Sequence, residues 1–168
     1  MTTDRPYFYA RYAHDQIETK GVNSHLLGHK IDRGPGASPD GVFAEWSWDG
    51  NQLTVKNDRY GLFPLYYCCA NNTIYLSPCI RQMLALGAPK DFDHDALAVF
   101  LRVGLFIGDD TPFKHIKILP PNAAFIWEKG ELTVSGNYPP SKPVAVSEND
   151  AIDKFIQLFR RSIQKRLP

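Results

Sequence analysis

The chain has 168 residues, of which 43% are hydrophobic and 22% are charged, and its formal net charge is +1. This length predicts one domain with enough chain to bury a core, and the composition is typical of an ordinary globular protein. The near-neutral charge excludes a general electrostatic attraction to nucleic acid or to an anionic membrane surface. We therefore expect neither nucleic acid nor membrane among its partners.

The cysteines and the N-terminus indicate a cytoplasmic protein with free thiols. Cys68, Cys69 and Cys79 are an odd number, and the first residues lack the apolar segment of a secretory signal. No apolar run approaches the length that crosses a bilayer. Cys68 and Cys69 are adjacent, so in a strand they point to opposite faces, which argues against zinc. We expect no metal site and no cofactor in this chain.

The first third of the chain predicts antiparallel strands. Residues 7–12 are aromatic and strand-like. Residues 14–33 are ambiguous, because their apolar residues follow no clear helical or strand period. Residues 42–48 alternate, with Val42, Ala44, Trp46 and Trp48 on one face. Asp49-Gly50 is a strong hairpin signal, and residues 53–55 form the return strand.

Residues 57–67 (Asn-Asp-Arg-Tyr-Gly-Leu-Phe-Pro-Leu-Tyr-Tyr) are the densest signal in the sequence. A strand ends in polar residues, a glycine turns the chain, and a proline leads into an aromatic strand. Asp58 and Arg59 are expected to pair locally, while Gly61 supplies a backbone angle that other residues avoid. The favoured interpretation is a structural motif, made of Asp58, Arg59, Gly61, Pro64, Leu65 and Tyr66.

Two short helices are predicted in the middle of the chain. Asn71-Asn72 turns the chain into a strand at residues 74–76. Ser77-Pro78 then predicts a helix start, with the serine as N-cap and the proline at the first helical position. Asp93 is expected to cap the next helix, and Gly104 to stop it.

The C-terminal part predicts a hairpin, a linker and a long helix. Residues 123–134 form the hairpin, with Lys129-Gly130 at its turn, and the proline-rich residues 139–146 form the linker. Residues 147–168 begin with a capping box and continue as an amphipathic helix. Such a helix needs a surface to pack on, so its apolar face is expected to dock a partner; it comprises Ile152, Phe155, Ile156, Phe159 and Ile163.

From Gly41 onward, the order of these elements resembles the N-terminal domain of asparagine synthetases, a class II (type 2) glutamine amidotransferase domain. The similar motifs are the Gly-x-Phe-Ala strand at residues 41–44, the turn at 57–67, Gly-x-x-Thr-Pro-Phe at 108–113, and Leu-Pro-Pro at 119–121. The resemblance implies an N-terminal-nucleophile hydrolase-like fold over residues 1–138. That is an α+β fold, with stacked antiparallel sheets and flanking helices in an αββα sandwich.

The groups with which this family hydrolyses glutamine are missing. Its catalytic cysteine follows Met1, where this chain has Thr2. Its oxyanion-hole segment and its His-Arg-Gly-Pro-Asp segment are absent. Residues 33–36 (Arg-Gly-Pro-Gly) are similar to the latter but lie too close to Gly41, so we interpret them as a loop. The region before Gly41 is short, which suggests that loops of the glutamine pocket are deleted.

The resemblance therefore implies a pseudoenzyme domain, which serves as scaffold for an ATP-dependent, amide-forming synthetase. It is similar to relatives without the nucleophile, such as beta-lactam synthetases and lasso-peptide cyclases. The sequence stops before the family's Ser-Gly-Gly-x-Asp-Ser phosphate loop, so we expect a fragment or a split subunit. ATP and Mg²⁺ are then expected only in a partner synthetase domain or subunit. A homodimer is left open.

Two alternatives remain from the residues themselves. Thr2 can act as an N-terminal nucleophile of a free-standing hydrolase, although no oxyanion donor is identifiable. Cys79, expected in the first turn of a helix and at the position of the family's glutamate, is a candidate reactive thiol. A small-molecule binding module that reuses the old glutamine cleft is a third interpretation.

Overall fold

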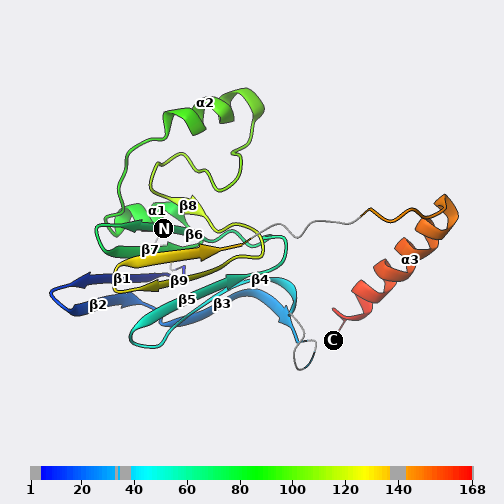
Figure 1. Cartoon of the computed structure of the whole chain (residues 1–168), viewed down its shortest axis with the longest axis horizontal. Helices are drawn as coiled ribbons and strands as arrows, with labels where there is room; N and C mark the ends of the chain where they lie inside the picture. Colours follow the sequence, from blue (N-terminus) through cyan, green and yellow to red (C-terminus); the bar gives the residue numbers. More distant parts are fainter. Residues whose placement is uncertain (1–4, 33, 35–38, 137–142, 168) are drawn as a thin grey trace.

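The computed structural model describes residues 5–32, 34, 39–136 and 143–167. Within them, strands form two stacked antiparallel sheets, and helices lie at the outside (Figure 1). The predicted α+β class with stacked antiparallel sheets is therefore confirmed.

Each sheet has five strands. The first sheet contains β1 (Phe8–Ala13), β2 (Gln16–Gly21), β6 (Tyr66–Ala70), β7 (Thr73–Ser77) and β8 (Lys117–Ile118), in the order β2-β1-β7-β6-β8. The second sheet contains β3 (Ser24–Ile31), β4 (Asp40–Trp48), β5 (Gln52–Asn57), β9 (Ala124–Glu128) and β10 (Glu131–Ser135), in the order β10-β9-β5-β4-β3. The helices are α1 (Ile80–Ala85), α2 (His94–Val103) and α3 (Glu148–Gln164).

Short turns set the register of the strands, as predicted. Asn71 and Asn72 have φ angles of 51° and 55°, which are those of the two-residue turn that matches the strand twist. Lys129 and Gly130 form a similar turn with φ angles of 48° and 90°. Residues 14–33, which gave no clear period, supply β2 and β3. Both are edge strands with largely exposed side chains, so no apolar alternation marks them.

The main core lies between the two sheets. Trp46 and Trp127 are its largest buried side chains, and Phe8 and Phe125 pack with them. The predicted apolar face of β4 is confirmed for Ala44 and Trp46, which belong to this core, and for Trp48, which packs at its margin. Val42 lies outside this core, at the mouth of the cleft described below.

A second core lies between the outer face of the first sheet and α1. Cys68 and Tyr75 of the sheet contact Met83 of α1 in this cluster, whereas Cys69 packs against the main core. The adjacent cysteines thus point to opposite faces, as predicted.

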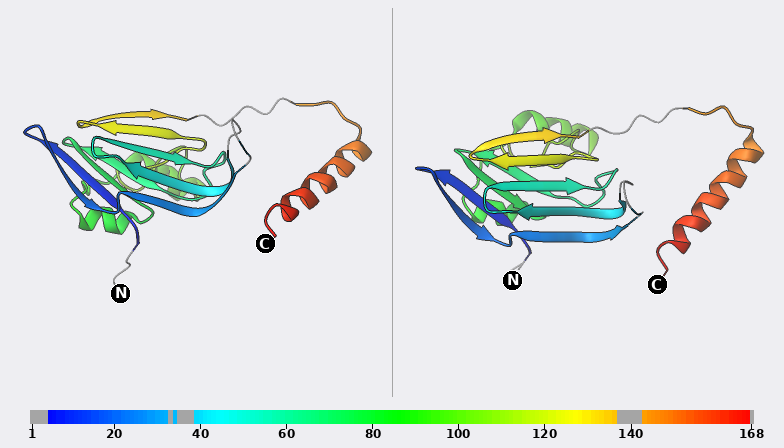
Figure 2. Two further views of the ribbon diagram at one scale, coloured as in Figure 1. Left: turned by 90° about the horizontal axis from the view of Figure 1, so that it is seen from below. Right: turned by 60° about the horizontal axis from the view of Figure 1, so that its bottom comes forward.

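The αββα layering is not reproduced by the described residues. No described helix covers the outer face of the second sheet, and the two views of Figure 2 show that face open. Polar side chains alternate with the buried ones there, such as Glu45 and Ser47 beside Trp46, and Thr54 beside Val55. A sheet with one polar face needs no second helical layer.

The start of α1 differs from the prediction. Ser77 is the last residue of β7, and Cys79 occupies the N-cap position with extended backbone angles. The Ser77 hydroxyl accepts a hydrogen bond from the Cys79 N–H at 3.1 Å and donates to the Gln82 side chain at 2.8 Å. The serine still serves the helix start, but two residues earlier than a cap, because β7 extends through it.

The caps of α2 and α3 are confirmed. Asp93 accepts a hydrogen bond from the Ala96 N–H, and Gly104 ends α2 with a left-handed φ of 80°. Ser147 accepts from the Asp150 N–H at the start of α3. Helix α3 stands away from the sheets, and none of its residues is buried (Figures 1 and 2). Among the described residues, no helix is both long and apolar enough to span a membrane.

Candidate functional site

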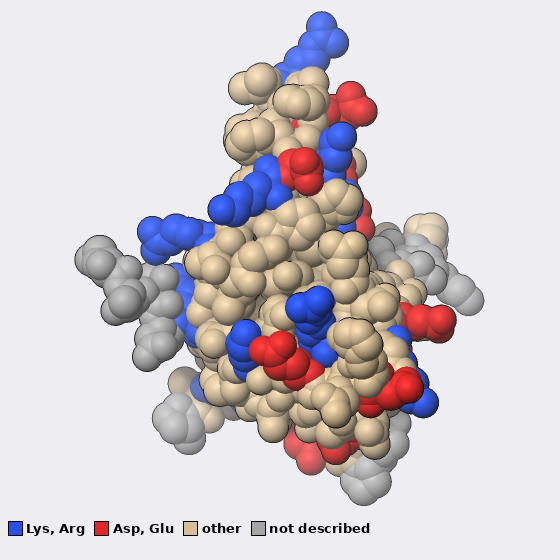
Figure 3. All heavy atoms as spheres, turned by 90° about the vertical axis from the view of Figure 1, so that its left-hand side faces the viewer, with Lys and Arg blue, Asp and Glu red and all other residues tan. Residues whose placement is uncertain are grey.

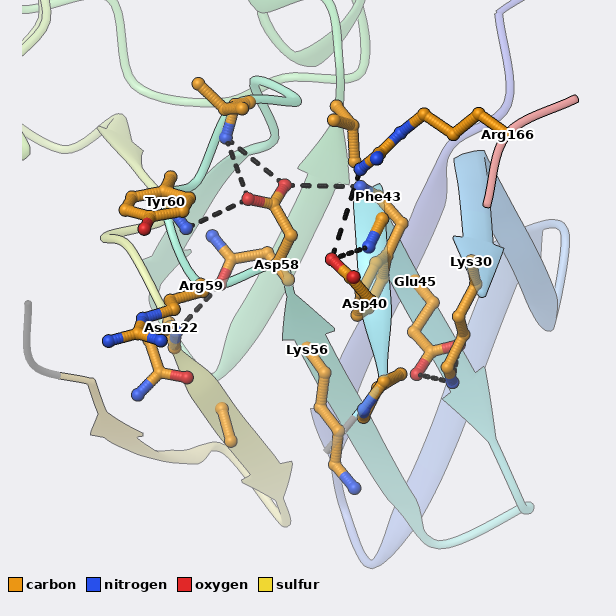
Figure 4. A pocket seen from close by; sticks show the side chains of 17 residues that line it. Lys30, Asp40, Phe43, Glu45, Lys56, Asp58, Arg59, Tyr60, Asn122 and Arg166 are labelled. Atoms are coloured by element: carbon orange, nitrogen blue, oxygen red, sulfur yellow. Dashed lines mark hydrogen bonds and ion pairs between the residues drawn. The ribbon is translucent and has the colours of Figure 1, made fainter. Parts of the chain in front are cut away.

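The turn after β5 is organised around a buried carboxylate. Asp58 is only 3% exposed. Its oxygens accept hydrogen bonds from the N–H groups of Phe43 at 3.2 Å, Tyr60 at 2.9 Å and Leu62 at 3.2 Å. Figure 4 shows these donors converging on the carboxylate from β4 and from the turn itself. Charge-assisted bonds of this kind are stronger than neutral ones, so Asp58 fixes the turn against β4.

Arg59 does not pair with Asp58, contrary to the prediction. No ion pair of the described residues joins them, and the Arg59 guanidinium lies over the Tyr60 ring at 5.8 Å. The backbone N–H groups already occupy the carboxylate of Asp58, and the arginine side chain extends into solvent.

A buried amide completes the same structure. The Asn57 side-chain oxygen accepts from the Ala123 N–H at 2.7 Å, and its NH₂ group donates to the Pro120 carbonyl oxygen at 2.8 Å. Gly61 has a φ of +61°, and a Cβ there would lie 3.2 Å from Pro121 Cα. The turn therefore packs against the segment that precedes β9, and its left-handed angle and close spacing both favour glycine.

The remaining motif residues lead into β6. Leu65 is fully buried, and its carbonyl oxygen accepts from the Leu119 N–H at 2.8 Å. Tyr66 begins β6 opposite Ser77, two residues after Pro64. Of the predicted motif residues, Asp58, Gly61 and Leu65 thus contact residues 119–122 before β9, whereas Arg59 extends into solvent.

A cleft with a volume of about 810 Å³ opens beside this turn, between the start of β4 and the segment before β9. Its described walls carry charges of both signs (Figure 4). Lys30 and Glu45 form an ion pair at 2.7 Å, while Lys56 has no ion-pair partner among the described residues. The lining residues are Lys30, Pro39, Asp40, Gly41, Val42, Phe43, Glu45, Lys56, Asn57, Asp58, Arg59, Tyr60, Leu62, Asn122, Ala123, Ala124 and Arg166.

Asp40 links the cleft to the C-terminal end of α3. Its carboxylate accepts a hydrogen bond from the Gly41 N–H at 2.9 Å and pairs with Lys165 at 3.3 Å. Arg166 lies 4.0 Å from the same carboxylate. The Gly41 N–H, and after it Lys165, hold the pKa of Asp40 below its ordinary value, although burial opposes them. The anionic form is therefore favoured at this edge of the cleft.

Neither Cys68 nor Cys79 is among the residues that line this cleft. Thr2 lies outside the described residues, as does Arg33. The first described residue after Thr2 along the chain is Arg5. Its carbonyl oxygen accepts a hydrogen bond from the Gln82 side chain, which belongs to α1, at 3.0 Å. Burial raises the pKa of Cys68 to about 12, which keeps its thiol protonated. Cys79 is half-buried at the start of α1 and is not a lining residue of the cleft.

No metal centre was found in the described part of the chain, and the face shown in Figure 3 carries no large surface of one charge sign. No group of three or more His, Cys, Asp or Glu side chains there is arranged to hold a metal ion. In the face shown in Figure 3, lysine and arginine side chains alternate with acidic ones and with uncharged surface. This distribution agrees with the balanced net charge.

Comparison with known families identifies the domain. A family model described as a glutamine amidotransferase domain matches residues 36–138, which is more than half of the chain. The chain belongs to the glutamine amidotransferase domain family. The match begins before β4 and ends just after β10, so it includes the Asp58 turn and all the lining residues of the cleft except Lys30 and Arg166.

A curated relative places the domain within this family. The chain is 26% identical over 127 residues to asparagine synthetase [glutamine-hydrolyzing] 1 of Bacillus subtilis (strain 168). The aligned part covers 73% of this chain and 20% of that protein, so the chain spans about a fifth of its length. The predicted asparagine-synthetase-like amidotransferase domain is confirmed.

The cleft residues were the part of the site that sequence reasoning missed. Lys30, Asp40 and Glu45 lie on β3 and β4, and no motif marks them. The one available signal was the alternation along β4. Because Ala44 and Trp46 face the core, Glu45 between them must face outward, where a cation on the neighbouring strand can reach it.

Proposed function

We propose that this domain is a non-catalytic scaffold with an N-terminal-nucleophile hydrolase-like fold. It would serve an asparagine-synthetase-like, ATP-dependent, amide-forming enzyme of the cytoplasm, without hydrolysing glutamine. The observation that carries the proposal is the residue at position 2. This chain has Thr2 there, whereas glutamine hydrolysis in this family uses an N-terminal cysteine as the side-chain nucleophile.

The hydrogen bonding of the cleft walls supports the same conclusion. Asn57 and Asp58 are the buried polar side chains at the cleft, and backbone groups occupy both of them. An oxyanion hole needs donors that are free to meet a developing charge. Here the N–H groups of Phe43, Tyr60 and Leu62 already donate to Asp58. The turn is therefore suited to holding strands together and poorly suited to stabilising an intermediate.

Helix α3 is proposed as the contact with the synthetase. Ile152, Phe155, Ile156, Phe159 and Ile163 are between 41% and 66% exposed, although they share one face. Burying such a face contributes about 1.5–3 kcal/mol for each large apolar side chain. The partner would be a synthetase domain or subunit that carries the phosphate loop, and ATP with Mg²⁺ would bind there.

The absence of glutaminase activity is tested by chemical labelling. The chain, with Met1 processed, is incubated with the glutamine-derived electrophile 6-diazo-5-oxo-L-norleucine, and its intact mass is measured. The Bacillus subtilis relative, whose name describes it as glutamine-hydrolysing, serves as the positive control. We expect an adduct on that control alone. An adduct on this chain that disappears in Thr2→Ala would overturn the scaffold function in favour of a Thr2 hydrolase.

The docking role of α3 is tested separately by co-purification with the phosphate-loop synthetase. Phe155→Asp places a charge on the apolar face, and Gln157→Asp places the same charge on the polar face. We expect Phe155→Asp to abolish co-purification and Gln157→Asp to preserve it. If both variants co-purify as well as the unmodified chain, another surface makes the contact.

A further inference from the structure

The acidic side chains in the described lining of the cleft already have their hydrogen-bond donors. The Asp58 oxygens accept three backbone N–H groups. Both oxygens of Glu45 accept from the Lys30 ammonium, at 2.7 and 2.9 Å. Asp40 accepts from the backbone and pairs with Lys165. The carboxylates of the cleft are therefore committed to partners within the chain.

Two cations of the same cleft, Lys56 and Arg59, have no ion-pair partner among the described residues. The strand register explains the first. Glu45 lies directly opposite Lys56 in the pairing of β4 with β5, but Lys30 on the other side of β4 holds both of its oxygens. Two lysines thus flank one glutamate. The Arg59 guanidinium contacts only the Tyr60 ring, at 5.8 Å, among the contacts of the described residues. Ammonium and guanidinium groups only donate hydrogen bonds, so this part of the cleft has more donors than acceptors.

A small residue leaves room beside these cations. Ala124 of β9 lies directly opposite Lys56 of β5, so the two side chains share one face of the sheet. Ala124 is half-buried and lines the cleft together with Lys56 and Arg59. Figure 4 shows that the side chains of Lys56 and Arg59 both extend away from Asp58, toward the lower part of the view. A methyl group at this position leaves space next to the ammonium that a longer side chain would fill.

We propose that the cleft binds a small organic anion beside Ala124, through the Lys56 ammonium and the Arg59 guanidinium. The ligand carries a phosphate or carboxylate group, whose oxygens supply the missing acceptors. The volume of about 810 Å³ is that of a small-molecule site, and Val42 and Leu62 offer apolar contact to the rest of the ligand. Because both cations are exposed, we expect a dissociation constant on the order of millimolar. Binding requires neither glutamine hydrolysis nor a synthetase, so it goes beyond the proposed function.

The first test is a titration of the isotope-labelled full chain with sodium phosphate at constant ionic strength, followed by NMR. We expect saturable shifts of the backbone amide signals around Ala124. Lys56→Gln and Arg59→Gln are each expected to weaken binding by roughly fivefold, the upper value for an exposed ion pair. Lys90→Gln removes an exposed lysine outside the cleft and, as the matched control, leaves the affinity unchanged. Shifts that do not saturate, or equal weakening in the control, overturn the proposal.

The second test identifies the charged group of the ligand. Succinate and L-glutamine replace phosphate in the same titration, at the same ionic strength. Tighter binding of phosphate than of succinate supports a phosphate ester as the ligand, and the reverse order supports a carboxylate. L-Glutamine has no net charge at neutral pH, so we expect it to give no saturable shift. If L-glutamine binds and neither anion does, the cleft is not an anion site and the proposal is wrong.

The third test supplies the missing acceptor within the chain. Ala124→Glu places a carboxylate next to Lys56, so we expect it to abolish phosphate binding. Ala124→Gln has the same size without the charge, and it is expected to bind phosphate more weakly than the unmodified chain but more tightly than Ala124→Glu. Circular dichroism shows whether both variants remain folded. If Ala124→Glu binds phosphate as tightly as Ala124→Gln, the charge of this site plays no part in binding and the proposal fails.

Discussion

The carboxylate of Asp58 accepts a hydrogen bond from the N–H of Phe43, and the N–H of Asp58 in turn donates to the Phe43 carbonyl oxygen at 2.9 Å. This reciprocal contact extends the pairing of β4 and β5 by one residue and anchors the turn that follows. Because the carboxylate is buried and also receives the N–H groups of Tyr60 and Leu62, replacing it leaves several donors without their partner.

Asp58→Asn is predicted to destabilise the domain by about 2–3 kcal/mol, since the amide lacks the charge and offers one acceptor oxygen where the carboxylate has two. The free energy of unfolding is measured by urea denaturation. Glu131→Gln is the control, because Glu131 is exposed and forms no side-chain hydrogen bond among the described residues. Equal stability of the two variants would show that the turn does not depend on this carboxylate.

Asn57→Ala is predicted to cost about 1–3 kcal/mol, because it removes both hydrogen bonds to the segment before β9 and leaves the Ala123 N–H unsatisfied. The loss is expected to be non-additive with Asp58→Asn, since the two side chains hold one turn. A double-mutant cycle with urea denaturation measures the coupling. Strict additivity would mean that the two residues act independently.

Alanine variants at two glycines with similar backbone angles distinguish the cost of conformational strain from the cost of steric overlap. Gly28 and Gly104 have φ angles of 81° and 80°. A Cβ at Gly28 would lie 2.2 Å from the Val42 carbonyl oxygen, whereas one at Gly104 meets nothing. Gly104→Ala is predicted to cost about 1–2 kcal/mol, the strain of a left-handed residue.

Gly28→Ala is predicted to cost clearly more than Gly104→Ala, because it carries the same strain and also forces β3 away from β4. The difference in urea midpoint between the two variants measures the destabilisation that comes from steric overlap of the added Cβ with the Val42 carbonyl oxygen. Equal midpoints would mean that edge strand β3 moves aside without cost, as an edge strand with one neighbour could.

Sequence reasoning succeeded where local chemistry alone decides the structure. The turn at Asn71-Asn72 and the cap at Asp93 follow from backbone angles and hydrogen bonds within a few residues, so no tertiary information was needed. The side on which Trp46 is buried followed from alternation in the same way.

The errors and omissions arose where distant segments meet. Asp58 was expected to pair with its neighbour Arg59, but its carboxylate accepts from the N–H groups of Tyr60, Leu62 and Phe43, and tertiary structure brings Phe43 beside it. Ser77 was expected to cap α1, but strand pairing with Tyr66 extends β7 through it. The cleft could not be predicted for the same reason, since its walls come from several strands and from Arg166 near the C-terminus.

Cys68 is predicted to resist alkylation in the folded domain, because burial raises the pKa of its thiol to about 12 and the thiolate is the reactive form. Half-buried Cys79 is expected to react first with iodoacetamide at neutral pH. Mass spectrometry of the modified peptides over a time course measures the order in which Cys68 and Cys79 are alkylated. Modification of Cys68 before Cys79 would contradict the burial of the thiol under α1.

The same pKa predicts how stability depends on pH. The folded state holds the Cys68 proton more tightly than the unfolded state, whose thiol has its ordinary pKa of 9.0. The folded state therefore binds more protons between these values, and the free energy of unfolding is expected to fall as the pH rises above 9.0 toward about 12. Cys68→Ala should reduce this slope, measured by urea denaturation in parallel. An unchanged slope would assign the effect to other groups.

Asp40 gives a prediction at the opposite end of the pH scale. Its folded pKa is lowered, so its contribution to stability is present above the unfolded pKa and is lost as the pH falls through the folded pKa. The Gly41 N–H is the larger cause and Lys165 the smaller one. Lys165→Ala is therefore predicted to raise the pKa of Asp40 only part of the way to its ordinary value. Titration of the Asp40 side-chain carboxyl by NMR measures its pKa in the unmodified chain and in Lys165→Ala. A complete return to the ordinary pKa in Lys165→Ala would show that the contact with α3, and not the local backbone, controls this carboxylate.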